Sequence, residues 1–334
     1  MSLDPAPLLH AFDSVTITPL FDCSGSSVDM LRLDSIDPVI SGNKWFKLKY
    51  NLYEAFRQGY RGIMSFGGRY SNHLHALAGA GSRLRFPAIG FVRCQGGQLP
   101  DPLNDTLIDC KRWGMMLEPL TYGEYRGRYS ADFCADLRAE YPGYFLVPEG
   151  GSNVAGVRGV AETLQQLELQ NYDYVVCPVG SGGTLAGVVA AVAGLESQPV
   201  GSASEKPTVV GVSALKGLAG KLERTVSELL AAYAVENAVL LSCDRRWRIL
   251  HEFHCGGFGK VSQSLMAFKE SFQARHGIEL EPVYTAKMMY AVCELLDRQY
   301  FAPCCRILVV HTGGLQGNRG LNLWSGIQSD EQSE

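Results

Sequence analysis

The sequence has no excess of positive charge and no run of lysine and arginine residues. It contains 30 Lys and Arg against 34 Asp and Glu, which gives a formal net charge of −4. Because nucleic acids are bound by basic surfaces, we do not expect a nucleic-acid partner. The 37 glycines follow no three-residue period, which excludes collagen, and an apolar content of 46% excludes a disordered chain.

The sequence also lacks paired cysteines and long apolar segments. Its ten cysteines are too few for a small disulfide scaffold, and none stands in a Cys-x-x-Cys pair. The most apolar stretch, residues 185–195, is too short to span a bilayer, and no basic-then-apolar segment opens the sequence. We therefore expect a cytoplasmic protein with reduced cysteines and no membrane partner.

A metal site is not expected either. Residues 251–255, His-Glu-Phe-His-Cys, contain metal-ligand side chains but not the His-Glu-x-x-His spacing of a ligand helix. The glycines that follow indicate a loop instead. His311, at the end of an apolar run, is expected to be a core histidine whose ring nitrogens are hydrogen-bonded.

The length of 334 residues suggests two domains, at roughly 150 residues per domain, with a single large domain as the alternative. Continuous apolar runs that alternate with helical patterns predict an α/β architecture of parallel strands covered by helices on both faces. A ligand site is then expected where the strands end, at glycine-rich and polar loops. The polar stretch 196–207 is predicted to be a surface loop. The predicted strands are residues 62–66, 87–92, 144–148, 174–179, 208–212 and 307–311.

The most informative of these loops follows the run 174–179. Its residues are Gly180, Ser181, Gly182, Gly183 and Thr184, and an Ala/Val-rich helix comes next. Such glycines let backbone N–H groups converge on an anion at a helix N-terminus, although a plain strand-to-helix turn has the same pattern. The loop matches neither the nucleotide P-loop nor the dinucleotide fingerprint. A phosphate on a small cofactor therefore fits this loop better than ATP or NAD.

A second loop, residues 41–49, carries two lysines three positions apart. Lys44 and Lys47 lie on one face of a predicted helix start, which in most proteins is simply a solvated basic surface. Here the neighbours Trp45, Phe46 and Leu48 are apolar. Burial among them would lower the lysine pKa from its usual value of about 10.4 and favour the nucleophilic, neutral amine. A nucleophilic lysine together with a phosphate loop suggests pyridoxal 5′-phosphate as the cofactor.

Six motifs occur in an order that resembles one family. They are Ser-Gly-Asn-Lys-x-x-Lys-Leu at 41–48, Phe-Gly-Gly-x-x-Ser-Asn-His at 66–73, Gly-Gly-Ser-Asn at 150–153, Val-Gly-Ser-Gly-Gly-Thr at 179–184, Pro-Val-Tyr-Thr at 282–285 and His-Thr-Gly-Gly at 311–314. Together they resemble the 1-aminocyclopropane-1-carboxylate deaminase / D-cysteine desulfhydrase family of fold-type II pyridoxal phosphate enzymes, which are tryptophan synthase beta-like.

The resemblance implies a two-domain enzyme with mostly parallel sheets and the cofactor in the interdomain cleft. The large, cofactor-binding domain would comprise residues 1–47 and 161–334, and the small domain residues 48–160. A homodimer that acts on a small amino-acid substrate is also implied.

The resemblance further assigns roles to individual residues. Lys44 would bind the cofactor aldehyde and act in catalysis, and Lys47 would reach the phosphate, which the loop 180–184 surrounds. Asn72 would contact the cofactor ring and its 3-hydroxyl. Ser71, Asn72 and His73 would lie at the substrate carboxylate, with Ser71 also catalytic. Tyr284 matches a catalytic, substrate-contacting tyrosine, for which the alternative is a core aromatic.

Thr285 distinguishes two branches of this family. The resemblance implies Glu at this position, facing the pyridine nitrogen, in cyclopropane deaminases and Thr in D-cysteine desulfhydrases. A hydroxyl leaves the nitrogen essentially neutral, a weaker electron sink that suffices for expelling a thiolate. We therefore expect D-cysteine desulfhydrase-like β-elimination to a 2-oxo acid, ammonia and sulfide. The alternatives are cyclopropane ring opening to 2-oxobutanoate and ammonia, and a protein that binds the cofactor without turnover.

Three residues, at two places in the sequence, depart from the family pattern. Phe258 stands where the family commonly has a tyrosine, so a phenol beside the substrate is missing. Trp45 and Phe46 replace a smaller residue and an arginine between the two lysines. Neither change affects the cofactor assignment, but both leave the substrate side chain open.

Overall fold

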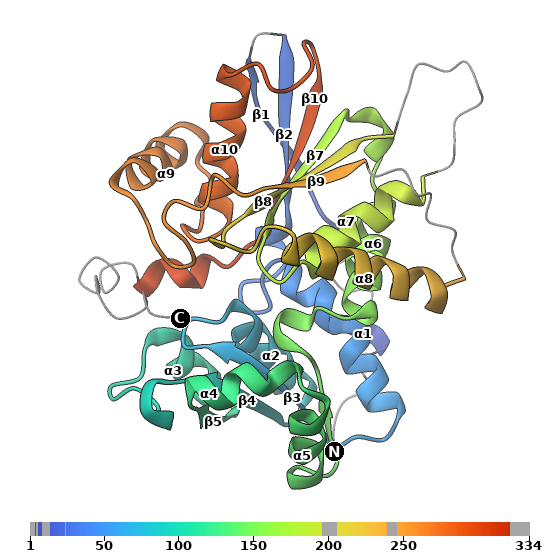
Figure 1. The fold of residues 1–334 in the computed structure, drawn as a ribbon, viewed down its shortest axis with the longest axis vertical. Helices are drawn as coiled ribbons and strands as arrows, with labels where there is room; N and C mark the ends of the chain where they lie inside the picture. Colours follow the sequence, from blue (N-terminus) through green and yellow to red (C-terminus); the bar gives the residue numbers. More distant parts are fainter. Residues whose placement is uncertain are drawn as a thin grey trace.

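The computed structural model describes residues 4, 6–8, 14–23, 25–195, 206–238 and 246–320. Its strands form two separate sheets, and helices flank both of them (Figure 1). The predicted α/β architecture with mostly parallel strands is therefore confirmed. Apart from its last two residues, the surface loop predicted at 196–207 lies outside the described residues.

The larger sheet has six strands in the order β1-β2-β10-β7-β8-β9. Strand β1 is antiparallel to β2, and all the other neighbours are parallel. Because β2 pairs with β10, the beginning and the end of the described chain meet in the middle of one sheet. The strands are β1 (Ile17–Cys23), β2 (Ser26–Arg32), β10 (Arg306–His311), β7 (Tyr174–Val179), β8 (Thr208–Ser213) and β9 (Trp247–Leu250).

Helices cover both faces of this sheet (Figure 1). Successive strand residues point to opposite faces, so Val175 packs toward α6, α7 and α8, while Val176 packs toward α9 and α10. Each face thus has its own hydrophobic core, as expected for a buried parallel sheet. The helices are α6 (Val154–Gln165), α7 (Gly183–Ala193), α8 (Lys221–Glu236), α9 (Gln263–His276) and α10 (Thr285–Asp297).

The smaller sheet has four parallel strands in the order β5-β4-β3-β6. Buried residues of α2 and α3 belong to a core on one face, whereas Tyr125 and Leu137, from α4 and α5, pack with Phe66 and Phe91 on the other. The elements are β3 (Gly62–Gly68), β4 (Ala88–Arg93), β5 (Met116–Leu120), β6 (Tyr144–Leu146), α2 (Asn72–Leu84), α3 (Asp105–Arg112), α4 (Tyr122–Arg126) and α5 (Ala131–Glu140).

Helix α1 (Asn43–Arg57) contacts helices of both sheets, namely α2 on one side and α6 and α7 on the other. The domain boundaries predicted at 47/48 and 160/161 fall inside α1 and α6. The division of the chain at these positions stays a prediction.

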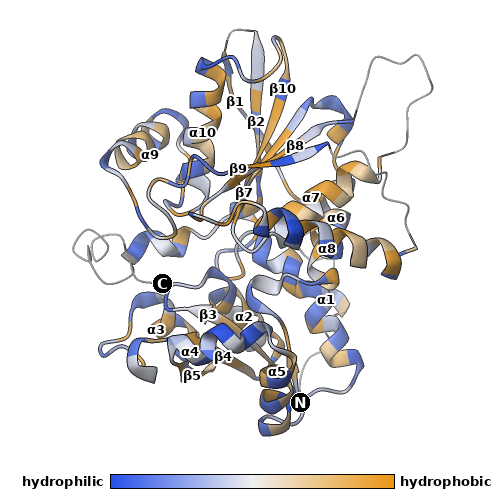
Figure 2. Cartoon of the chain, viewed as in Figure 1, coloured by the Kyte–Doolittle hydropathy of each residue, from blue (hydrophilic) through white to orange (hydrophobic). Residues whose placement is uncertain are grey.

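Helix α7 is the apolar segment noted in the sequence. Figure 2 shows hydrophobic residues along its length and along the strands of the larger sheet. It has 11 residues, most of them buried, and it packs against α6, α8 and the sheet. Within the described ranges, no helix is both long and apolar enough to cross a membrane.

Candidate functional site

The glycine-rich loop between β7 and α7 has the form predicted for an anion cup. Gly182 has φ 84° and is the N-cap of α7, so no side chain caps the first N–H groups of this helix. A Cβ atom at Gly183 would lie 2.9 Å from the Lys47 amine. Glycine is therefore required for the close approach of Lys47, and the N–H groups that no side chain caps leave the helix end able to bind an anion.

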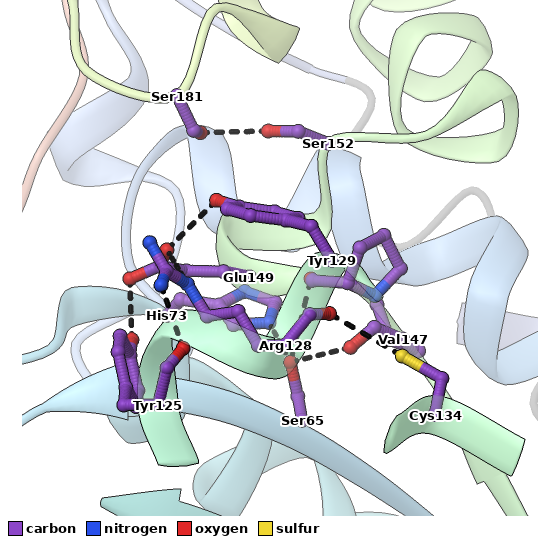
Figure 3. Close-up of polar contacts among 11 residues, drawn as sticks. Ser65, His73, Tyr125, Arg128, Tyr129, Cys134, Val147, Glu149, Ser152 and Ser181 are labelled. Carbon is purple, nitrogen blue, oxygen red and sulfur yellow. Dashed lines mark hydrogen bonds and ion pairs between the residues drawn. The ribbon is translucent and has the colours of Figure 1, made fainter. Parts of the chain in front are cut away.

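Lys47 joins the cup from helix α1. Its Nζ atom donates to Ser152 Oγ at 2.9 Å and lies 3.5 Å from Ser181 Oγ, and these two hydroxyls are 2.6 Å apart (Figure 3). Burial, and then the charge of Lys44, lower the pKa of Lys47 well below its usual value, while the charge of Glu149 acts in the opposite direction. An anion beside Lys47 would favour its charged form, which the pocket otherwise disfavours.

Lys44 lies one turn earlier, at the start of the same helix. Its Nζ atom donates to Asn43 Oδ1 at 2.9 Å, and Asn43 Nδ2 donates to Thr184 Oγ1 at 2.6 Å. Burial lowers the pKa of Lys44 to about 8, against the opposing charge of Glu281. A substantial fraction of this amine is therefore neutral near physiological pH, which is the form that attacks an aldehyde.

Tyr284 forms another wall of the cup at the start of α10. A Cβ atom at Gly180 would lie 2.9 Å from the Tyr284 ring and 3.1 Å from its hydroxyl oxygen. Burial and the charges of Glu281 and Glu149 raise the pKa of this hydroxyl, so it stays protonated. The Phe258 ring packs edge-on against the Tyr284 ring, with 6.1 Å between the centroids.

The buried carboxylate of Glu281 holds the turn that leads into α10. It accepts hydrogen bonds from the N–H groups of Val283 at 2.7 Å and Tyr284 at 2.9 Å. Burial raises the pKa of Glu281 to about 7, although the two N–H groups and the charges of Lys287 and Lys44 oppose this. The Thr285 hydroxyl, also buried, accepts from Glu281 N at 2.7 Å and donates to Glu281 O at 3.1 Å. Glu281 therefore fixes both Tyr284 and Thr285.

The predicted substrate residues lie at the N-terminus of α2. Ser71 is its N-cap and accepts from Leu74 N at 3.2 Å, and Asn72 Oδ1 accepts from Gln316 at 2.6 Å. His73 is buried, with Nε2 2.9 Å from Ser65 Oγ (Figure 3). Burial, followed by the charges of Lys47 and Lys44, lowers the pKa of His73 well below its usual value. The imidazole is thus neutral and within electrostatic reach of both lysines.

The structure therefore brings Lys47 to Ser181 and beside Gly183, and it brings Tyr284 to Phe258 and beside Gly180. Sequence reasoning assigned no role to Asn43, Ser152 or Glu281. Asn43 and Ser152 stand inside the motifs 41–48 and 150–153, and each directly follows a glycine, so their polar side chains were an available signal. Glu281 is one acidic residue before Pro282, and nothing in its local pattern distinguishes it.

His311 and His251 make hydrogen bonds to other residues in the structure. His311 is buried, with Nε2 2.8 Å from Glu279 O, and its Nδ1 accepts from Gly313 N at 3.1 Å. It is thus the satisfied core histidine that was predicted. His251 pairs with Glu223 at 2.7 Å. No cluster of three or more His, Cys, Asp or Glu side chains among the described residues could hold a metal ion.

The site thus combines an amine of lowered pKa with a helix-end cup for an anion at the carboxyl end of a parallel strand. Fold and site together define an α/β enzyme suited to a phosphorylated cofactor that carries an aldehyde.

Comparison with known proteins agrees with this class. A family model described as pyridoxal-phosphate dependent enzyme matches residues 11–313, and the chain belongs to this family. A putative 1-aminocyclopropane-1-carboxylate deaminase of Thermotoga maritima is 29% identical over 328 residues, which cover 95% of this chain and 96% of the relative. A D-cysteine desulfhydrase of Klebsiella pneumoniae subsp. pneumoniae is 27% identical over 312 residues, 88% of this chain and 89% of the relative.

The fold has a solved counterpart in the crystal structure of a homologue of 1-aminocyclopropane-1-carboxylate deaminase. The TM-score is 0.75 at 24% identity, with 97% of this chain and 99% of the other covered. The predicted family and the pyridoxal 5′-phosphate cofactor are therefore confirmed.

Proposed function

We propose that the protein is a pyridoxal-phosphate dependent lyase that converts a small amino acid to a 2-oxo acid and ammonia by β-elimination, as a D-cysteine desulfhydrase does. The observation that carries this proposal is the link from Lys44 through Asn43 to Thr184. This link would hold a nucleophilic amine at a fixed separation from the anion cup, which is the arrangement that a cofactor with an aldehyde and a phosphate requires. The relatives named above support the same class of reaction.

The residues present fit this cofactor. Lys44 would bind its aldehyde, and Lys47, Ser152, Ser181 and the N–H groups that follow Gly182 would hold its phosphate. When bound, the cofactor withdraws electrons from the bonds around the substrate Cα atom. Burial disfavours the charged form of Lys47, and the negative phosphate would favour it again. The cofactor and the cup are therefore electrostatically complementary.

The side chains of this chain would then move and hold protons. The Lys44 amine, whose lowered pKa leaves part of it neutral near physiological pH, takes the proton from the substrate Cα atom. The Tyr284 hydroxyl, protonated because of its raised pKa, is available to the leaving group. Ser71 and Asn72 bind the substrate carboxylate at the N-terminal end of α2, where the helix dipole favours an anion.

Thr285 supports elimination over ring opening. Its hydroxyl is buried and bonded to the backbone of Glu281, and it carries no charge to hold a proton on the pyridine nitrogen. Elimination of a thiolate needs a weaker electron sink than opening a cyclopropane. The second candidate, 1-aminocyclopropane-1-carboxylate deaminase, is favoured by the Thermotoga maritima relative of that name.

The substrate can be tested by supplying the holoenzyme with D-cysteine, L-cysteine and 1-aminocyclopropane-1-carboxylate and measuring 2-oxo acid and ammonia. We expect pyruvate and sulfide from D-cysteine to form fastest. Faster 2-oxobutanoate release from the cyclopropane would reject the argument from Thr285. If no 2-oxo acid formed from any amino acid in a broad D- and L-panel, the protein would bind the cofactor without turnover.

The cofactor site can be tested by absorbance. The visible or near-ultraviolet band of the lysine-bound cofactor should disappear in Lys44→Ala. It should remain in Lys221→Ala, a control at an exposed lysine on α8. Survival of the band in Lys44→Ala would mean that another lysine binds the aldehyde.

We further propose a cytoplasmic homodimer with the domain division at 47/48 and 160/161 and the cofactor between the two domains. The resemblance to the deaminase and desulfhydrase family supports this. Light scattering of the purified holoenzyme tests the dimer, since a mass of one chain, 36.5 kDa, would contradict it.

A further inference from the structure

A compact polar cluster lies on the smaller sheet's side of the cup, and neither the motifs nor the proposed reaction accounts for it. The carboxylate of Glu149 accepts three hydrogen bonds: from Tyr125 at 2.5 Å, Arg128 at 2.7 Å and Tyr129 at 3.0 Å (Figure 3). The Arg128 guanidinium packs on the rings of Tyr125 and Tyr129, with 4.3 and 4.4 Å to their centroids. Charge-assisted bonds and stacked rings of this kind make the cluster rigid.

The three donors all come from one short segment. Tyr125 is on α4, and Arg128 and Tyr129 are on the 3₁₀ turn η4 (Gly127–Tyr129) that follows it. Glu149 is the first residue of another 3₁₀ turn, η5 (Glu149–Gly151). The cluster therefore ties the beginning of η5 to the α4–η4 segment.

Turn η5 runs directly against the cup. Gly150 and Gly151 have φ of 68° and 62°. A Cβ atom at Gly150 would lie 2.7 Å from Ser181 Oγ, and one at Gly151 would lie 3.1 Å from Lys47. The next residue after the turn is Ser152, whose hydroxyl bonds both Lys47 and Ser181. The position of Ser152 in the cup thus depends on the path of η5.

We propose that Glu149 is a positioning residue for the phosphate group of the cofactor: held by Tyr125, Arg128 and Tyr129, it fixes turn η5 so that Ser152 meets Lys47 and Ser181. This inference rests on the proposed placement of the phosphate in the cup. It gives Tyr125, Arg128 and Tyr129, none of which takes part in the proposed reaction, a role in holding the cofactor site.

Tyr129→Phe separates positioning from electrostatics, because it removes a hydrogen bond to Glu149 but leaves its charge. The charge of Glu149 reaches the cup, where it favours the charged form of Lys47 and the protonated form of Tyr284. A charged Lys47 attracts a phosphate and the charge of Glu149 repels one, so removal of this charge acts in both directions. If charge alone mattered, Tyr129→Phe would bind the cofactor as the unmodified enzyme does. If Glu149 positions the turn, both Glu149→Gln and Tyr129→Phe bind it more weakly.

The test measures cofactor retention in the holoenzyme. The loss of the bound-cofactor absorbance band after dilution measures the release of pyridoxal 5′-phosphate. Rebinding is measured with pyridoxal 5′-phosphate and with pyridoxal, which has no phosphate. We expect Glu149→Gln to retain pyridoxal 5′-phosphate about tenfold less well, because weakening charge-assisted hydrogen bonds has effects of this order. Binding of pyridoxal should stay within about twofold of the unmodified enzyme, since only the phosphate contacts change.

The chain offers a matched control on α6. Glu162 accepts from Arg158 Nε at 2.7 Å and from the Tyr50 hydroxyl, and Arg158 packs 4.3 Å from the Tyr50 centroid. Glu162→Gln thus removes the same charge from the same kind of cluster, and no described contact joins that cluster to Ser152 or Ser181. We expect its cofactor retention to be unchanged.

Two further variants test the cluster and the cup separately. Tyr129→Phe removes one donor from a ring that is 64% exposed, so it keeps the fold and should give a smaller loss of the same kind, even if Glu149→Gln does not fold. Unchanged or tighter pyridoxal 5′-phosphate binding, or an equal loss for pyridoxal, would overturn the inference. Lys47→Met tests the cup itself. If Lys47→Met leaves phosphate-dependent binding unchanged, the proposed cofactor placement fails. If Lys47→Met loses phosphate-dependent binding and Glu149→Gln does not, only the role of Glu149 is rejected.

Discussion

The side-chain amide of Asn43 donates to the hydroxyl of Thr184 at 2.6 Å, and both groups are buried. Asn43 is the first residue of α1 and Thr184 the second residue of α7. The helix that carries the two lysines and the helix that forms the anion cup therefore begin at one shared contact. Because Asn43 Oδ1 also accepts from Lys44 Nζ at 2.9 Å, one amide orients the amine relative to the cup.

Asn43→Ala should therefore damage both stability and cofactor binding. It removes a buried hydrogen bond and leaves the Thr184 hydroxyl without this donor, which should lower the free energy of unfolding by about 1–3 kcal/mol. Chemical denaturation of the apo-protein measures this loss, and the bound-cofactor band measures affinity. Asn171→Ala is the control, since the exposed Asn171 bonds only Glu168 at 2.8 Å among the described residues. Equal effects of the two variants would contradict the importance of the contact.

Gly183→Ala should separate cofactor binding from folding. The added methyl group would lie 2.8 Å from Ser152 Oγ and 2.9 Å from Lys47 Nζ, so both side chains must move out of the cup. The change favours the helix by up to about 1 kcal/mol, so the protein should fold while its retention of pyridoxal 5′-phosphate falls. Gly123→Ala on α4 is the matched control, because its nearest neighbour would be the Thr121 hydroxyl at 3.8 Å. Normal retention in Gly183→Ala would show that the cup tolerates a methyl group.

Among the described strands, the sequence predicted interior strands better than edge strands, although it missed the interior strand β2 and predicted the edge strand β6. Strands β3, β4, β7, β8 and β10 are continuous apolar runs covered on both faces, and each lies within a residue or two of its predicted range. Strands β1 and β5 are edge strands that contain Pro19 and Pro119 and are only partly buried. Such strands have no continuous apolar pattern, because solvent covers part of their surface.

The residues of the site could be predicted where a short sequence motif indicates their chemical role. The glycines at 180–183 and the two lysines on one helix face are such patterns, and the structure brings Lys47 to Ser181. The roles of Glu149 and Glu281 depend on partners far away in the sequence or on the path of a turn. Glu281 bonds two N–H groups of its own turn, a geometry that one acidic residue before a proline does not specify.

The pH dependence of cofactor capture should report on Lys44 and Glu281. Because the neutral amine attacks the aldehyde, the capture rate of the apo-protein should rise with pH, be half-maximal near the Lys44 pKa of about 8, and level off above it. The ionised carboxylate of Glu281 raises the pKa of Lys44. Glu281→Gln removes that charge, so the Lys44 pKa falls and the rising part of the profile moves to lower pH.

Stopped-flow absorbance on mixing with pyridoxal 5′-phosphate measures this profile. The titrations of the free cofactor are the same for both proteins and cancel in the ratio of their rates. Glu279→Gln is the control, because the Glu279 carboxylate bonds Asn318 at 2.6 Å and is not among the charges that act on Lys44. A profile that stays in place in Glu281→Gln, or moves to higher pH, would contradict the assignment.

Phe258→Tyr should shift the balance between the two candidate substrates. Phe258 is 45% exposed and packs edge-on against Tyr284, so an added hydroxyl should change stability by no more than about 0.5 kcal/mol. The resemblance places a phenol here in related enzymes, where it could carry a proton to the substrate. Because a positioned proton carrier acts on the chemical step, kcat for 1-aminocyclopropane-1-carboxylate should rise relative to that for D-cysteine by about tenfold or more, with little change in KM.

Phe268→Tyr, on α9 beside Tyr290, adds the same hydroxyl away from the site and should leave the ratio of kcat values unchanged. If both variants left this ratio unchanged, the missing phenol would have no part in substrate choice, and Thr285 would remain as the residue that decides between elimination and ring opening.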